Sequence, residues 1–259
     1  MASVLSLRIL VDFLAATVRM ATPLGFAAVG GVYSERSGVF NIALEGLMLG
    51  GAFGAVMGSH WTGSPSVGLA LAALVGAALA MVHAVACVSF GANQIVSGVA
   101  LNLLALGGTT YLNRVLLRAS EVERVAAFEV LPIPGLGHIP VVGPVLFQQT
   151  APVYLLYCLV PVAAFVLFRT PWGLAVRAVG EYPRAADTAG LSVTAIRYAC
   201  VILSGVMAGL GGAFLSVAHV KMFTENMSAG RGFIALTAVI FGKWHPVGAA
   251  AACFVFGAA

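Results

Sequence analysis

Long apolar segments separated by short polar breaks dominate this chain. No Asp, Glu, Lys or Arg occurs between Gly46 and Asn113, which leaves room for about three membrane spans of ~20 residues each. Residues 59–66 and 90–93 supply the polar or glycine-bearing breaks between these spans. The apolar/polar alternation of membrane β-barrel strands is missing. The pattern therefore predicts an all-α fold, a polytopic bundle of transmembrane helices.

The same pattern predicts an order of elements along the chain. Arg8, Asp12 and Arg19 fall on one narrow stripe, which favours an interfacial amphipathic helix at 4–20, although a charged span is an alternative. A short span at 22–34 and a polar break at 35–41 follow. The remaining spans are expected at 42–58, 67–89, 93–112, 151–168 and 198–218, then a half-span at 232–242 and a last span from about 246, with loops at 113–150, 169–197 and 219–231.

Composition agrees with a membrane protein. The chain is 61% hydrophobic and 8% charged, against about a quarter charged in soluble domains, so a water-soluble globule is excluded. We expect residues 1–259 to form a single membrane-spanning domain. Its last apolar segment reaches Ala259 without a polar flank, so we expect that the chain is truncated there. The net charge of +4 is a property of the loops and does not indicate a nucleic-acid partner.

Basic residues in the loops indicate an orientation. The polar segment 169–197 holds four Arg, and the loop 113–150 holds three. By the positive-inside rule, this small excess favours a cytoplasmic 169–197 and an external 113–150.

Two segments of the chain resemble each other. Residues 37–51, "SGVFNIALEGLMLGG", match residues 229–243, "AGRGFIALTAVIFGK", at five positions, and both restart a hydrophobic helix after a glycine-bearing break. The expected topology gives them opposite directions. Interrupted helices in corresponding places of inverted halves indicate the solute route of a transporter. We therefore expect interrupted helices and a possible inverted repeat.

Polar side chains inside the predicted spans are candidates for a solute pathway. These candidates are Glu45, Asn93, Gln94 and Ser97. Each has a structural alternative: Glu45 suits the first turn of a helix that Asn41 can cap, and uncharged amides and hydroxyls also hold helices together. Asn102 points away from the arc shared by Asn93, Gln94 and Ser97. The small residues around Gly205 and Gly209 predict close helix packing.

Catalytic signatures are absent from the sequence. It contains no HExxH, no G-x-S-x-G and no P-loop, and its five His and four Cys are scattered without metal-ligand spacing. We predict no enzyme activity, no nucleotide site, no metal site and no cofactor.

A short polar helix is predicted within the segment 169–197. Pro183 suits its first turn and Gly190 its end, which gives a helix at 183–189. Ala185, Ala186 and Ala189 share one face, whereas Arg184, Asp187 and Thr188 point away. This small apolar face is typical of a docking surface, and an ordinary solvated helix is the alternative.

Four blocks of the sequence resemble one family. Residues 170–193, "TPWGLAVRAVGEYPRAADTAGLSV", resemble the coupling-helix loop of permease subunits in bacterial ABC importers, in the branch for branched-chain amino acids, ribose and nucleosides. Residues 35–53, 92–102 and 231–249 resemble the nucleoside or simple-sugar subgroup, which works with basic-membrane-protein-type lipoproteins.

The resemblance implies a function and partners. It implies a multi-pass channel subunit of the bacterial inner membrane that pairs with a second permease subunit, as a homodimer or a heterodimer. This subunit receives nucleosides or simple sugars from an external binding lipoprotein. A cytoplasmic ATPase, which binds the ATP, drives transport. The residues that the resemblance assigns to ATPase coupling are Gly180, Glu181, Pro183, Arg184, Ala185, Ala186 and Gly190, and Ala189 joins them on the predicted face. The resemblance also makes Asn41, Glu45, Asn93 and Gln94 candidates for the translocation path. An ion-coupled secondary transporter is the alternative, but it requires a relay of buried ionisable groups, and Glu45 stands nearly alone.

Overall fold

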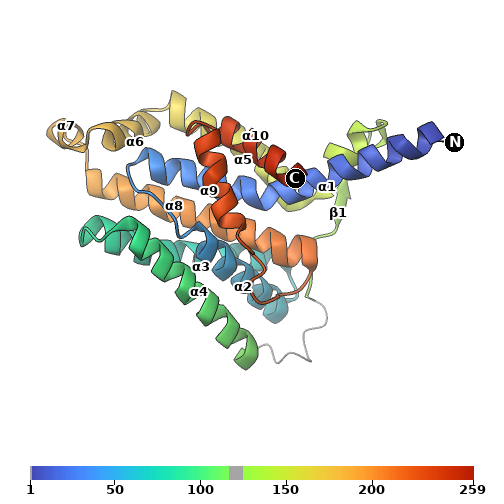
Figure 1. The fold of residues 1–259 in the computed structure, drawn as a ribbon, viewed down its shortest axis with the longest axis horizontal. Helices are drawn as coiled ribbons and strands as arrows, with labels where there is room; N and C mark the ends of the chain where they lie inside the picture. The colour runs from blue at the N-terminus through green and yellow to red at the C-terminus, as the bar shows by residue number, and fades with distance from the viewer. Residues whose placement is uncertain (1, 117–124) are drawn as a thin grey trace.

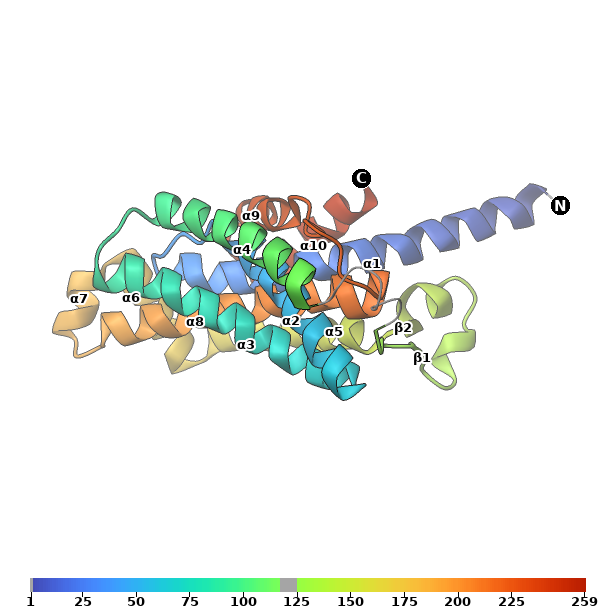
Figure 2. The same ribbon diagram turned by 90° about the horizontal axis from the view of Figure 1, so that it is seen from below.

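The computed structural model describes residues 2–116 and 125–259, and most of them are helical (Figure 1, and from below in Figure 2). The helices are α1 (Ala2–Arg36), α2 (Leu44–Thr62), α3 (Pro65–Ala84), α4 (Gln94–Leu116), α5 (Ala151–Arg169), α6 (Pro171–Glu181), α7 (Pro183–Thr188), α8 (Val193–Ala213), α9 (Arg231–Phe241) and α10 (Pro246–Ala258). Two of them continue as π-helical turns, α3 through Val85–Ser89 and α8 through Phe214–Val220. The strands β1 (Val130–Pro132) and β2 (Gln148–Thr150) pair antiparallel around short helical turns at Leu136–His138 and Gly143–Phe147.

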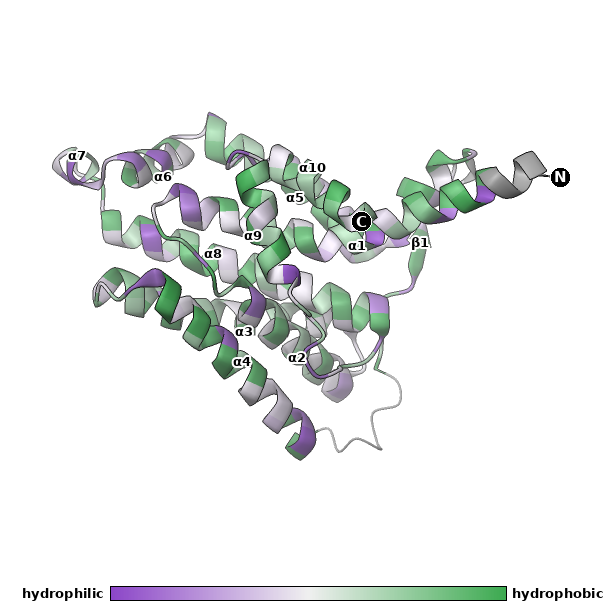
Figure 3. Ribbon diagram, viewed as in Figure 1, coloured by the Kyte–Doolittle hydropathy of each residue, from purple (hydrophilic) through white to green (hydrophobic). Residues whose placement is uncertain are grey.

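Among residues 2–116 and 125–259, five helices are long and apolar enough to cross a membrane. They cover Leu7–Arg36, Pro65–Ser89, Gln94–Leu116, Ala151–Arg169 and Val193–Val220, and α9 and α10 are shorter apolar helices. The prediction of an all-α, polytopic helical bundle is therefore confirmed. Hydrophilic residues gather on α6 and α7 at one end of the bundle (Figure 3). Two of the three Arg in the loop 113–150, Arg118 and Arg124, lie outside the described residues.

The expected interfacial helix at 4–20 and separate span at 22–34 are wrong. A single helix, α1, runs through Pro23 without a break. Its inner part packs along α8 and α10, and this packing outweighs the hydrogen bond that a proline removes. At ~1.5 Å per residue, α1 is about 50 Å long, well beyond the ~30 Å of a bilayer core. Its N-terminal turns accordingly project past the other helices (Figure 1).

Helix α2 is the centre of the bundle. Every residue from Leu44 to Ser59 is buried, and α3, α4, α8 and α9 surround it. A helix that is apolar on all sides suits this place. The segment 37–43 leads from the end of α1 back into the bundle, where α2 begins (Figure 1).

Glycines allow the central helices to touch through their backbones. A Cβ atom at Gly205 of α8 would overlap the Gly76 carbonyl oxygen and the Ala80 side chain of α3. One at Gly51 of α2 would overlap the backbone of Gly209. The predicted packing role of the small residues on α8 is confirmed.

We predict that Gly205→Ala destabilises the protein, whereas Gly107→Ala does not. A Cβ at Gly107, on the exposed side of α4, meets nothing within 4 Å. Overpacking at Gly205 costs about 1–3 kcal/mol, while alanine in an open helical position gains up to ~1 kcal/mol. Thermal unfolding of the purified protein in detergent measures both changes, and equal midpoints for the two variants would contradict the packing.

Candidate functional site

Helices α2 and α9 begin beside each other inside the bundle, and one carboxylate joins them. The Gly230 N–H donates to Oε1 of Glu45 at 2.8 Å, and the Gly232 N–H donates to Oε2 at 2.7 Å. The close approach requires glycine, because a Cβ at Gly232 would lie 2.5 Å from the Glu45 Cα. Glu45 thus caps the start of α9 from the first turn of α2. The two segments whose sequences resemble each other meet at this point.

Two side chains of α4 form hydrogen bonds with backbone groups in the break before α2 and in its first turn. The amide of Asn102 on α4 accepts from the Gly46 N–H at 2.8 Å and donates to the Ile42 carbonyl at 3.0 Å. The Gln94 Oε1 accepts from the Phe40 N–H at 2.7 Å. Because an unsatisfied backbone group is costly where water is excluded, these amides allow non-helical backbone at this depth.

A cavity of about 360 Å³ adjoins the two helix starts. It is lined by Glu45, Gly46 and Leu49 of α2, by Val99, Asn102, Leu103 and Leu106 of α4, and by Asn226, Gly230 and Phe233. Among these described residues, Glu45 is the one that carries a charge. The wall thus offers two amides and an aromatic ring beside aliphatic side chains. This composition suits a small, uncharged, polar solute.

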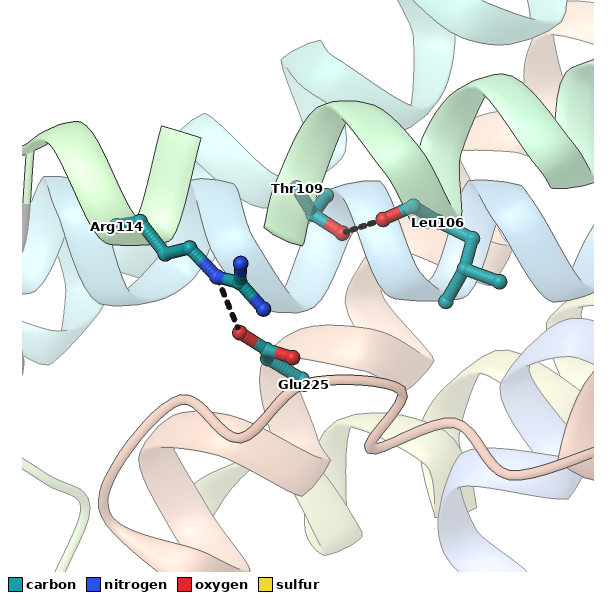
Figure 4. A network of polar contacts seen from close by, with 4 residues as sticks. All are labelled: Leu106, Thr109, Arg114 and Glu225. Carbon is teal, nitrogen blue, oxygen red and sulfur yellow. Dashed lines mark hydrogen bonds and ion pairs between the residues drawn. The ribbon is translucent and has the colours of Figure 1, made fainter. Parts of the chain in front are cut away.

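An ion pair lies beyond this cavity, at the far end of α4 from α7. The Arg114 Nε lies 3.2 Å from the Glu225 Oε1 and ties α4 to the loop that leads to α9 (Figure 4). Leu106 of the cavity wall lies two turns before Arg114 on the same helix. Both charged side chains are largely exposed, and such pairs contribute only ~0–1 kcal/mol. The pair therefore holds α4 and the loop together weakly.

The polar segment 169–197 folds into α6, α7 and the start of α8. The predicted helix at 183–189 is confirmed by α7, and Gly190 ends it with a φ of 85°. Helix α6 was not predicted. The sequence nevertheless contains two helix-start signals at this point. The Thr170 hydroxyl caps the helix by accepting from the Gly173 N–H, and Pro171 occupies the first turn.

The structure corrects one member of the predicted docking face. Ala186 is only 5% exposed, because it packs into its own chain, and so it does not belong to the outward surface of α7. Ala185 and Ala189 are exposed, as are Glu181, Arg184 and Gly190, and Pro183 is half-buried.

This segment contacts the break before α2 directly. A Cβ at Gly180 would overlap the Arg36 carbonyl oxygen, so the two backbones touch. The Arg197 Nε donates to the Ser37 carbonyl at 3.2 Å. The end of α6 and the start of α8 thus hold the beginning of the segment that leads to the cavity.

Comparison with known proteins identifies the family. The model of the family described as branched-chain amino acid transport system, permease component, matches residues 13–259. The chain belongs to this permease family. It is 44% identical to the guanosine ABC transporter permease protein NupQ of Bacillus subtilis, over 93% of this chain and 78% of that protein. No solved structure matches the chain.

Two further relatives bear on the kind of solute. The nucleoside ABC transporter permease protein NupC of Lactococcus lactis is 42% identical over 92% of this chain and 77% of its own length. The putative glucose ABC transporter permease protein TsgC13 of Haloferax volcanii is 41% identical over 93% of this chain and 74% of its own length.

In this permease, the five pathway candidates divide into two groups. Asn41, Glu45 and Gln94 gather around the break before α2, where Asn41 also donates to the Ser204 hydroxyl at 3.1 Å. Asn93 caps α4 through the Ile95 N–H, and Ser97 lies 3.0 Å from the His83 ring. These last two line a separate cavity of about 430 Å³ between α3 and α4.

Sequence reasoning missed Asn102 as a member of the site. Its different direction on α4 was taken to separate it from the other amides, yet that direction faces α2. A signal was present, since an amide inside an apolar span requires a partner, and the break before α2 offers unpaired backbone groups.

We predict that Asn102→Ala strongly destabilises the permease. The substitution leaves the Gly46 N–H and the Ile42 carbonyl without their partner, and each buried unsatisfied group costs about 1–3 kcal/mol. Asn113→Ala, near the far end of the same helix, is the matched control and should change stability by less than ~0.5 kcal/mol. Thermal unfolding in detergent compares the two, and a wild-type midpoint for Asn102→Ala would show that these hydrogen bonds do not stabilise the break.

Proposed function

We propose that this permease is a membrane channel subunit of an ATP-driven importer for nucleosides or related simple sugars. The observation that carries the proposal is the cavity beside Glu45 and Asn102. It lies where α2 and α9 begin inside the bundle. Interrupted helices at the substrate site are typical of transporters. Two amides and the Phe233 ring suit a polar solute with a flat face, such as a nucleoside. The names of the three relatives support the same solute classes.

The proposal includes the partners of such a system. A cytoplasmic ATPase binds the ATP, a second permease subunit, identical or related, completes the channel, and an external lipoprotein delivers the solute. The permease lies in the inner membrane of a bacterium. Exposed apolar side chains on α4 outside the cavity wall, including Ile95, Tyr111 and Val115, contact lipid or the second subunit. The hydrophilic segment 169–197 lies in the cytoplasm, in keeping with its arginines.

An ion-coupled secondary transporter is the competing proposal. Such a transporter requires buried ionisable groups that are free to exchange ions. Both oxygens of Glu45 already accept backbone N–H groups. The contacts of Glu45 thus favour a cap over a relay.

We predict that uptake of guanosine by proteoliposomes requires ATP. The vesicles contain the permease with its ATPase and second subunit, and they receive the binding lipoprotein outside and ATP inside. Uptake should stop when ATP is omitted and should persist when an ionophore collapses the ion gradients. Uptake that follows an ion gradient without ATP would instead support the secondary transporter.

We predict that Ala189→Glu weakens ATPase binding more than Thr188→Glu does. Thr188 ends α7 and Ala189 follows it directly; both are exposed and about 100° apart, so the helix dipole affects both to a similar extent. A carboxylate pressed without a partner into an apolar groove costs several kcal/mol, whereas a solvated one costs a few tenths. Co-purification of the ATPase measures the difference.

Equal behaviour of these two variants would contradict a docking role for the alanine face. Ala186→Glu is unsuitable for this test, because Ala186 is buried within the permease and the change would destabilise the subunit itself.

A further inference from the structure

The carboxylate of Glu45 occupies the N-terminal end of α9. Glu45 receives the Gly230 and Gly232 N–H groups, one on each oxygen. In transporters with broken helices, the N-terminal ends of half-helices typically point at an anionic group of the substrate. In this permease, the side chain of a neighbouring helix takes the place of that group.

The charges around Glu45 balance. A helix N-terminus is equivalent to roughly +0.5 elementary charge. Glu45 lies on the first turn of α2 and against the first turn of α9, so two such ends face its single negative charge. The other described residues of the cavity wall are uncharged. The cavity therefore offers a solute almost no net charge.

We propose that Glu45 determines the charge selectivity of this cavity: it admits neutral polar solutes and rejects solutes that carry a carboxylate or a phosphate. The inference rests on the proposed function, because it requires that the solute passes through this cavity. An anionic solute would lose its hydration in a cavity whose helix N–H groups already bind Glu45, so no positive charge compensates this loss. A neutral solute with hydroxyl groups has a smaller desolvation cost and retains the Asn102 and Asn226 amides as neighbours.

A binding experiment tests the inference. The purified complex of permease subunits and ATPase is titrated with uridine and with uridine-5′-carboxylate, and the rise in its unfolding temperature gives each affinity. The binding lipoprotein is omitted, because its own selectivity would mask that of the cavity. The wild-type complex should bind uridine in preference to the carboxylate. Glu45→Gln, which keeps one carbonyl oxygen as an acceptor, should shift this preference about tenfold toward the carboxylate.

Two further variants make the test decisive. Glu225→Gln removes the same charge from an exposed residue outside the cavity wall, and it should leave the preference unchanged. Leu106→Lys adds a positive charge to the wall without touching the hydrogen bonds of Glu45. It should also shift the preference toward the carboxylate, which tests whether the solute binds in this cavity.

The outcomes separate this inference from the proposed function. Uridine binding with an unchanged preference in Glu45→Gln would overturn the role of Glu45 and leave a nucleoside route in place. An unchanged preference in Leu106→Lys would overturn the inference as well, because the solute would then bind outside this cavity. Equal wild-type affinity for the two solutes, or no wild-type binding of either, would also overturn it. ATP-driven guanosine uptake, measured separately, decides whether the importer itself stands.

Discussion

The architecture depends on satisfying backbone groups at two helix starts inside an apolar bundle. The N–H groups at the start of a helix lack intrahelical acceptors, and inside a membrane no water is present to accept their hydrogen bonds. The carboxylate of Glu45 accepts these hydrogen bonds at the start of α9, and the side chains of Asn102 and Gln94 accept those around the start of α2. Three polar side chains in otherwise apolar sequence therefore permit the two interruptions, and the cavity exists because the helices begin there.

The interruptions also explain the small residues in the centre. A helix that begins within the bundle has no anchor in solvent at that end, so the position of its start depends on lateral contacts. Helix α2 obtains these contacts by backbone approach to α8, through Gly51, Gly209 and Gly212, and to α3, through Gly58 and Gly68. Short-range dispersion between closely packed backbones thus fixes a helix that few polar contacts hold.

Hydrophobic pattern alone predicted most of the fold. The membrane helices and α7 lie close to where periodicity, Pro183 and Gly190 placed them. Pattern failed at Pro23, where packing on α8 and α10 keeps α1 continuous, and at α6, whose start depends on the Thr170 cap. The site was only partly predictable: single-helix geometry identified polar residues, but the partners of Glu45 and Asn102, and the burial of Ala186, arise from contacts between distant segments.

The contact between Gly180 and the carbonyl of Arg36 has a mechanical consequence. Two backbones in direct contact cannot absorb a displacement by changing rotamers, as long side chains do. A shift of the α6–α7 hairpin toward the bundle must therefore move the end of α1 and the segment behind it. That segment carries Phe40, whose N–H is bound to Gln94 on α4. The hairpin and one wall of the cavity are thus joined by a short, stiff linkage that transmits force with little slack.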